Sequence, residues 1–258
     1  MNYHIHTKVS WEQKLSKPWE DTFYPSLTKK IRKSDSYFEE LFELKITPVE
    51  NISEADNFFS IYNKEIASRG NYIYKPDEQK NILDKKILDG KKYTQASIIN
   101  KNTNQYAGGI IFSIVDDKLS FALRAFDKET RSNYRSVTTI DFWVEKKIFE
   151  YARNEKLPAI SHGTDNYPNK GRVGLVLFKL KLGGKPKVSK KEHEVLELSD
   201  LDIVNFNVPT FFWDKPDENE YFKTAHLFYA PGSIDESVLG ELIKVCEWAG
   251  VELLIHQS

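Results

Sequence analysis

The stretch YTQASIINKNTNQYAGGIIFSIVDDKLSFALRAF, residues 93–126, contains three apolar runs joined by two short polar turns. The turns are KNTN and DD, and both have the length and composition of hairpin connections. Runs rich in Ile, Val, Phe and Tyr favour strands. We therefore predict three consecutive antiparallel strands, and the elements around them decide the fold.

Two helices are predicted before this meander. Ser53 and Asp56 resemble an N-cap pair at the start of a helix that Gly70 ends, and a second helix begins near Pro76 and ends at Gly90. Apolar residues at helical spacing should face inward in both. They are Phe58, Phe59, Tyr62 and Ile66 in the first helix, and Ile82, Leu83, Ile87 and Leu88 in the second. A short strand, LKITPV, precedes them and is expected to stop at Pro48.

After the meander we predict a helix in TTIDFWVEKKIFEYARNEK, a strand in PAISHG and a short helix in KGRVGLVLFKLKLG. Residues 187–222 hold two further strands, in KVSKKEHEVLEL and IVNFNVPTFFW. The chain closes with a strand, a helix and a strand. The first 44 residues contain one strand-like stretch, YHIHTKVSW, and are expected to form an extension packed on the main body.

The composition bounds the function. Of the 258 residues, 37 are Lys or Arg and 38 are Asp or Glu, so a formal net charge of -1 argues against a general nucleic-acid binder. The single cysteine, Cys246, excludes an internal disulfide and a cysteine zinc site and is expected to be a buried thiol. Neither a signal peptide nor an 18-residue apolar span is evident, which makes a cytoplasmic location the default expectation.

The order of two helices, an antiparallel meander, a helix, a strand and a helix resembles the GCN5-related N-acetyltransferase (GNAT) fold over residues 46–186. The resemblance implies an α/β (α+β) fold with a mixed, mostly antiparallel sheet flanked by helices. It also implies that acyl-CoA lies beside a splayed strand, with its pyrophosphate on the N-terminus of the helix after the meander. A helix start offers unpaired N–H groups and the positive end of the dipole, which suits phosphate.

The corresponding turn here is RSNYRSVTTIDFW, residues 131–143, and it lacks the glycines of the family's usual signature. What remains is a hydroxyl-rich segment with two arginines that suits phosphate oxygens. The alternative is that Ser136, Thr138 and Thr139 simply cap the helix. The resemblance implies the following residues at the cofactor: Phe126, Arg131, Tyr134, Arg135, Ser136, Val137, Thr138, Thr139, Asn169 and Lys179.

The sequence is most similar to the FemA/FemB-like branch, the peptidoglycan-bridge aminoacyltransferases and their single-domain relatives. The matching pieces are Thr138–Trp143, Ile148, Ala152, His162-Gly163, Gly174-Leu175, Phe178-Lys179 and Gly183. This resemblance implies aminoacyl-tRNA as an alternative donor to acyl-CoA. A chain of this length has little room for the tandem domains of typical members.

Acyl transfer to an amine needs a base, and His162 has the side chain whose ordinary pKa lies nearest neutrality. Asp165 could orient it or act itself, and Tyr167 is the candidate acid. The structural alternative is that His162 is a hydrogen-bonded histidine at a strand end, and that Lys179 only complements the dipole of its helix. His226 is expected in the core, and the pair His4 and His6 is expected to be structural, so no metal is predicted.

The dense basic run KLKLGGKPKVSKK, residues 179–191, is either a solvated face or a contact for a phosphate, a tRNA or an acidic glycan. We predict three segments: an extension (1–45), the acyltransferase core (46–190) and a C-terminal part (191–258) that completes the sheet or forms a dimer face. The predicted function is transfer of an acyl group, most simply acetyl, from acyl-CoA to a small-molecule, sugar or peptide amine. The alternatives are an aminoacyl-tRNA-dependent enzyme and a binding protein without catalysis.

Overall fold

The structure is a computed structural model, and it describes residues 2–68, 75, 77–133, 139–167, 169–170, 172–189, 194–199 and 208–257. Contacts divide the chain into two compact units. We call Ser26–Ile160 the meander unit, and Met1–Pro25 together with Ser161–Ser258 the terminal unit. The boundaries of these units differ from those of the three predicted segments, because the first 25 residues belong to the same unit as the C-terminal part of the chain.

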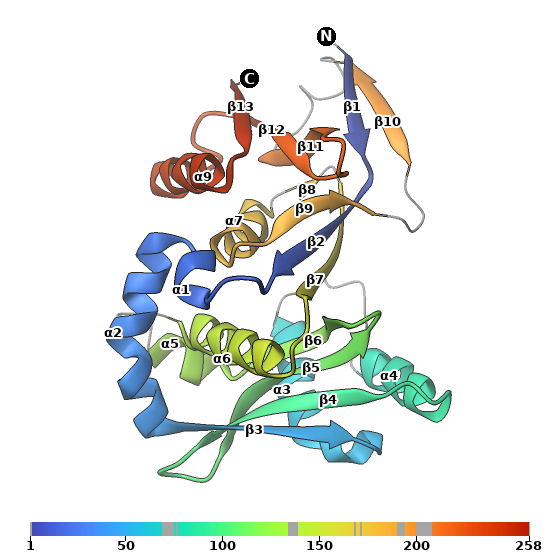
Figure 1. Ribbon diagram of the computed structural model, residues 1–258, viewed down its shortest axis with the longest axis vertical. Coiled ribbons are helices and arrows are strands. Elements are labelled where there is room, and N and C mark those ends of the chain that lie inside the picture. The colour runs from blue at the N-terminus through green and yellow to red at the C-terminus, as the bar shows by residue number, and fades with distance from the viewer. Residues whose placement is uncertain are drawn as a thin grey trace. The chain divides into compact units, whose positions relative to one another are not determined.

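The meander unit contains four strands in the order β3-β4-β5-β6, each antiparallel to the next (Figure 1). They are β3 (Phe42–Val49), β4 (Tyr93–Asn100), β5 (Tyr106–Val115) and β6 (Lys118–Phe126). The predicted meander is therefore confirmed. β3 continues past Pro48 to Val49, contrary to the prediction. Pro48 is tolerated because β3 pairs only with β4 within this unit, so the missing N–H need not cost a ladder bond.

Helices cover both faces of this sheet, as Figure 1 shows. Phe58 and Phe59 pack with Ile111 in one apolar cluster, whereas the neighbouring residue Phe112 contacts the ring of Tyr151 on the other face. Alternation along β5 thus explains its continuous apolar sequence, which is buried on both sides. The helices of this unit are α2 (Pro25–Leu41), η1 (Ile52–Ala55), α3 (Asp56–Ser68), α4 (Glu78–Leu88), α5 (Lys128–Asn133) and α6 (Ile140–Asn154).

Two details of the predicted helices are wrong, and one helix was not predicted. The cap before α3 is Asn51, whose side chain accepts a hydrogen bond from the Ser53 N–H at 3.0 Å. Leu88 is 80% exposed rather than inward, because α4 ends there and its buried contact is made by Leu83. The 17-residue helix α2 was not expected at all, although its buried Leu27, Ile31 and Phe38 have helical spacing.

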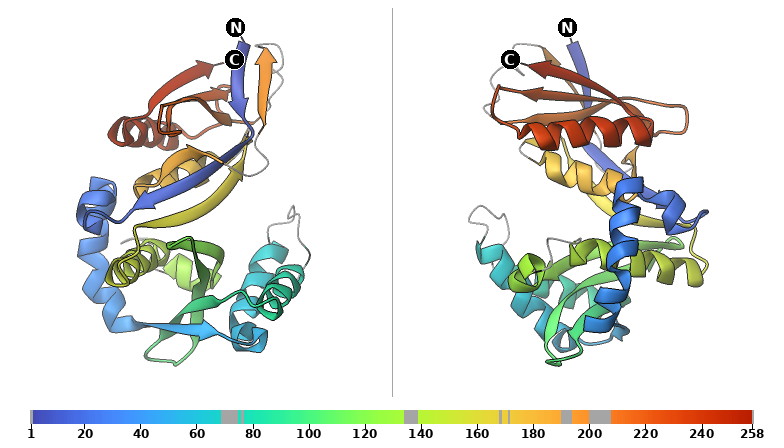
Figure 2. Two further views of the ribbon diagram at one scale, coloured as in Figure 1. Left: turned by 45° about the vertical axis from the view of Figure 1, so that its right-hand side comes forward. Right: turned by 90° about the vertical axis from the view of Figure 1, so that its left-hand side faces the viewer.

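The terminal unit is built around three neighbouring strands in the order β7-β2-β9 and a second sheet in the order β13-β12-β11-β8. The helix α9 lies between that second sheet and α7 in Figures 1 and 2, and its buried Leu242, Val245 and Cys246 belong to the core of this unit. The predicted closing strand, helix and strand are confirmed, with β13 parallel to β12. The elements of this unit are β1 (Asn2–His6), β2 (Lys8–Lys14), α1 (Trp19–Thr22), β7 (Ala159–Asn166), β8 (Asn169–Lys170), α7 (Val173–Lys181), β9 (Lys185–Val188), β10 (Val195–Ser199), β11 (Thr210–Pro216), β12 (Phe222–Tyr229), α9 (Glu236–Ala249) and β13 (Glu252–Gln257).

The N-terminal residues are integral to this unit. β2 lies between β7 and β9, and β1 pairs with β10. Two expected strands differ from the prediction within the described residues. In the stretch 187–198, β9 ends at Val188 and β10 begins at Val195, and in the stretch 203–213 β11 begins at Thr210. Residues 190–193 and 203–207 of these stretches lie outside the described residues.

Two expectations about single residues are confirmed. Cys246 is fully buried, as predicted, and burial raises the pKa of its thiol to about 12. His226 is also buried, and its Nδ1 lies 3.0 Å from Nε2 of His256. No helix among the described residues is long and apolar enough to cross a membrane.

Candidate functional site

The site residues expected on β7 meet the buried face of β2. Along β2 the burial alternates, so that Val9, Trp11 and Gln13 point into the protein. Two of these three side chains bind predicted site residues. Sequence reasoning missed both Trp11 and Gln13, although the alternating pattern of KVSWEQK is the signal that could have found them.

Asp165 accepts hydrogen bonds from two buried donors. Nζ of Lys179 lies 2.8 and 2.9 Å from the two carboxylate oxygens, and Nε1 of Trp11 donates to Oδ2 at 2.8 Å. The ammonium group also lies 5.4 Å from the centre of the Trp11 ring. The side chains of Lys179 and Asp165 are only 7% and 13% exposed. The structure thus directs the charge of Lys179 to Asp165, in an internal ion pair that connects α7 to β7.

His162 is bound by Gln13 rather than by Asp165. The amide nitrogen of Gln13 donates to the backbone oxygen of Leu182, which turns its amide oxygen toward His162. That oxygen lies 2.9 Å from Nε2 of the ring, and because an amide oxygen only accepts, Nε2 must carry the proton. Gln13 therefore fixes the tautomer of the neutral ring, in which Nδ1 is the basic nitrogen.

Gly163 allows both contacts to form on one strand face. His162 and Asp165 are three residues apart, yet they bind Gln13 and Trp11, which are two residues apart. One residue of β7 must therefore break the alternation. Gly163 has φ +80°, a backbone conformation that L side chains rarely adopt, and it lies between the two site residues.

Gly183 and Gly184 end the helix that carries Lys179. The Gly184 N–H donates to the oxygen of Lys179 at 3.0 Å, and the Gly183 N–H donates to that of Leu180 at 2.8 Å. With φ +78° at Gly183 this is a Schellman cap. A Cβ at Gly183 would also lie 2.3 Å from the backbone oxygen of Thr22. These glycines are explained by helix termination and close packing.

The other predicted site residues are spread over the two units. Tyr167 is 4% exposed, packs in the core of the terminal unit and donates its N–H to the oxygen of Thr7 at 2.8 Å. Asn169 pairs through its backbone with Phe211 in β8 and β11. Phe126 is buried at the end of β6 in the meander unit.

Thr139 is the N-cap residue of α6, and its side chain makes no capping hydrogen bond. The alternative that this hydroxyl only caps the helix is therefore not met. The predicted phosphate-binding residues Tyr134, Arg135, Ser136, Val137 and Thr138 lie outside the described residues, as does the side chain of Arg131.

Within the described part of the chain no three His, Cys, Asp or Glu residues are placed to hold an ion. The ring of His6, one of the paired histidines near the N-terminus, packs against Phe222 with centroids 4.9 Å apart.

No protein-family model matches this sequence, and a search of curated proteins gives no significant match. Solved structures do match. FemX is 13% identical with a TM-score of 0.50, over 70% of this chain and 60% of its own. L-PGS from Bacillus licheniformis (12% identity, 69% and 53% covered, TM-score 0.43) and a tandem GNAT protein from the clavulanic acid biosynthesis pathway (10%, 72% and 52%, 0.41) are less similar. The chain thus spans about 60% of the FemX chain that it matches, and it has the GNAT-like fold of FemX that the sequence resemblance predicted.

Proposed function

We propose that this protein is an N-acyltransferase that moves an acyl group from acyl-CoA to an amine. The observation that carries the proposal is the FemX-like, GNAT-like fold, in which the meander β4-β5-β6 is followed along the chain by the helix α6. Folds host many activities, so the proposal also draws on the residues around these elements.

The start of α6 supports acyl-CoA as the donor. Thr139 leaves its hydroxyl out of helix capping, and the segment before it supplies two arginines and further hydroxyls. N–H groups at the start of a 15-residue helix favour an anion, and arginine adds paired donors for phosphate oxygens. The residues present therefore fit the pyrophosphate of CoA.

His162 is the base in this proposal. The amine attacks the thioester carbonyl, the carbon–sulfur bond breaks, the thiolate leaves, and the surplus proton of the nitrogen passes to the base. Because Nε2 contacts Gln13, the proposal assigns that proton to Nδ1. Asp165 is already engaged by Lys179 and Trp11, so its part is to position β7 against β2 and α7.

Thermal unfolding with acetyl-CoA tests donor binding. At about 100 times the dissociation constant the ligand should stabilise the protein by roughly 2.7 kcal/mol, a shift of several degrees. Arg135→Ala should abolish the shift. Arg153→Ala is the matched control, because Arg153 lies in the last turn of α6, away from the proposed phosphates.

Release of CoA thiol in the presence of a panel of amines then tests the chemistry. His162→Gln should lower kcat by about 10²- to 10⁴-fold and leave the acetyl-CoA shift intact. No shift with any acyl-CoA and no thiol release would refute the proposal. Salt-sensitive retention of charged tRNA would in that case point to the aminoacyl-tRNA donor.

A further inference from the structure

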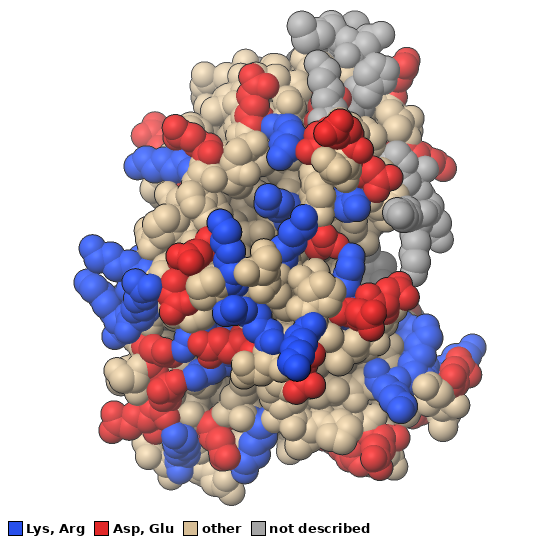
Figure 3. Space-filling view, viewed as in Figure 1, with Lys and Arg blue, Asp and Glu red and all other residues tan. Residues whose placement is uncertain are grey.

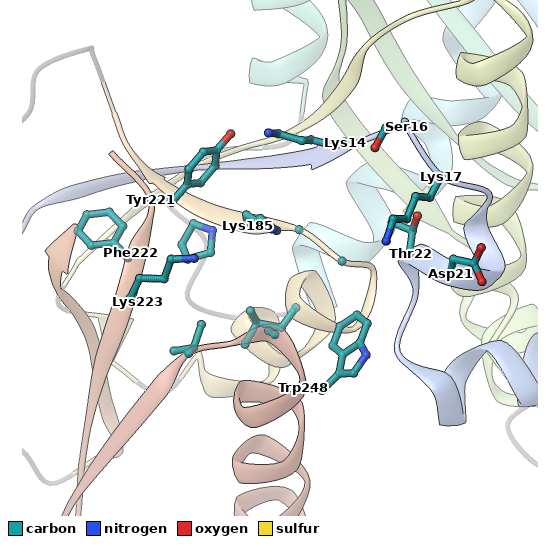
Figure 4. A pocket seen from close by; sticks show the side chains of 16 residues that line it. Lys14, Ser16, Lys17, Asp21, Thr22, Lys185, Tyr221, Phe222, Lys223 and Trp248 are labelled. Carbon is teal, nitrogen blue, oxygen red and sulfur yellow. The ribbon is translucent and has the colours of Figure 1, made fainter. Parts of the chain in front are cut away.

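A concave site separate from His162 and Asp165 lies wholly within the terminal unit. It is a cavity of about 360 Å³ beside the end of β2, the helix α1, the start of β9 and the end of α9 (Figure 4). This volume is in the range of small-molecule sites. Its lining includes four lysines: Lys14, Lys17, Lys185 and Lys223. We call this cavity the lysine pocket.

The four lysines come from three segments of the chain, with Lys14 and Lys17 in the first, and they approach one cavity, as the sticks in Figure 4 show. Asp21 is the acid among the described lining residues. The pKa of Lys185 is lowered, first by burial and then by the charges of Lys223, Lys14 and Lys17. Asp217, which lies 3.7 Å from Lys223, acts in the opposite direction. Like charges gathered in this way repel one another, so the arrangement favours an anion among them.

Three other lysines of the basic run form ion pairs, and Lys190 and Lys191 lie outside the described residues. Lys179 pairs with Asp165, Lys181 lies 2.7 Å from Glu241, and Lys187 lies 3.5 Å from Glu220. Lys185, in contrast, makes no ion pair within the described part of the chain. In Figure 3, Lys and Arg side chains gather on the face that displays β2 and β9. Among the described lysines of the run, Lys185 is therefore the one without an ion pair, and it lines the pocket.

Aromatic rings form the walls between these charges. Tyr221 is held in place because its hydroxyl donates to Glu12 at 2.7 Å, and Nζ of Lys14 lies 5.6 Å from its ring centre. Trp248 is 36% exposed and rests edge-on against Tyr24, with centroids 5.4 Å apart. The pocket thus offers ammonium groups to an anion and flat apolar surfaces to an attached organic group.

We propose that the lysine pocket binds a small molecule that carries a phosphate or pyrophosphate group. Lysine ammonium groups bind phosphate as mobile point charges, and several of them together suit a dianion better than a carboxylate. The inference does not depend on acyltransferase activity. An acyl-CoA donor and a phosphorylated acceptor both carry this group, and the experiment below separates them.

Inorganic pyrophosphate is the probe, and binding to the whole chain is measured by calorimetry at low and at high salt. Lys185→Gln should weaken binding about tenfold, as expected for the loss of one charge-assisted contact. Lys187→Gln is the matched control: it removes the same charge two residues along β9, outside the pocket, and should change binding about twofold or less. Binding should also weaken as salt rises. Because both lysines are partly exposed, unchanged melting temperatures will verify that the variants are folded.

No pyrophosphate binding to the parent protein, or equal losses in the two variants, would overturn the inference. Coenzyme A then identifies the source of the phosphate. If it displaces pyrophosphate and Lys185→Gln weakens both, the pocket takes the donor. If both bind at once and only pyrophosphate binding needs Lys185, the pocket takes a separate phosphorylated molecule. Failure of acetyl transfer alters neither result, because pyrophosphate undergoes no transfer.

Discussion

Lys179 and Lys185 are six residues apart in one basic run, yet the structure uses them in opposite ways. Lys179 lies in α7, is 7% exposed and forms an ion pair with Asp165 beneath the ring of Trp11. Lys185 follows the turn at Gly183 and faces three other lysines across a cavity. One charge is satisfied within the fold, and the other is available to a ligand.

The difference teaches that a charge run has no single function. Up to residue 181 the period of α7 decides which way a lysine side chain points. From residue 185 the alternation of β9 decides it. A buried charge must be paired within the protein, whereas a charge at a cavity can be solvated by water until a ligand binds. Stability measurements should therefore separate the buried network from the lysine pocket.

The largest expected effect is that of Lys179→Met. This substitution leaves the carboxylate of Asp165 buried without its cation, which should cost about 3–5 kcal/mol of unfolding free energy. Lys185→Met, by contrast, relieves repulsion and should change stability by no more than about 0.5 kcal/mol. Urea denaturation of both variants measures the difference.

A double variant tests the cause of that loss. Lys179→Met combined with Asp165→Asn removes both charges and should regain a substantial part of the stability, because no buried ion remains. The asparagine can still accept the hydrogen bond from Trp11. Equal stability of the single and double variants would mean that lost packing, and not the unpaired charge, explains the effect.

Gly183→Ala should have the next largest effect. Gly183 lies in the turn between Lys179 and Lys185. A side chain at φ +78° costs about 1–2 kcal/mol, and its Cβ would also lie 2.3 Å from the Thr22 oxygen. We expect a total loss of about 2–4 kcal/mol. Gly232→Ala is the matched control, with φ +77° and nothing within 4 Å of its Cβ. Its smaller loss should isolate the clash with Thr22, and equal losses would contradict the close packing.

The sequence predicted the elements whose patterns are local. The meander, α6, β7, α7 and the closing strand, helix and strand follow from apolar periodicity and turn residues, and Gly90 ends α4 as expected. The fold followed from the order of these elements. The sequence located the basic run but did not show which of its lysines are paired. Their partners, Asp165, Glu241 and Glu220, lie elsewhere in the chain.

The candidate site was predicted only in part for the same reason. His162 and Asp165 were named from their chemistry, but their partners Gln13 and Trp11 lie about 150 residues earlier. No local pattern connects β2 to β7. The lysine pocket was missed because its residues come from four separate segments, and only Lys185 belongs to a visible cluster.

Gln13→Leu sharpens the comparison on a single strand. It removes the amide that joins His162 to the oxygen of Leu182, and leaving buried polar groups unsatisfied should cost about 1–3 kcal/mol. The next residue, Lys14, belongs to the lysine pocket and is exposed, so Lys14→Leu should change stability by about 0.5 kcal/mol or less. Chemical denaturation measures both, and similar losses at the two positions would contradict the division of β2 between the sites.

The smallest effect concerns the core behind the lysine pocket, where Cys246 lies on α9 two residues before Trp248. Burial raises the pKa of its thiol from 9.0 to about 12, so the folded protein keeps the proton where the unfolded chain loses it. That contribution to stability is complete below pH 9 and is lost as the pH rises toward 12. Between pH 8 and pH 10 the loss of this contribution should amount to about 1.4 kcal/mol. Cys246→Ala removes the titration, so the fall in unfolding free energy over this interval should be smaller by that amount. Comparing the change with pH, instead of absolute stability, cancels the cost of the cavity that alanine leaves. An equal fall in both proteins would mean that the thiol ionises as readily in the folded state as in the unfolded chain.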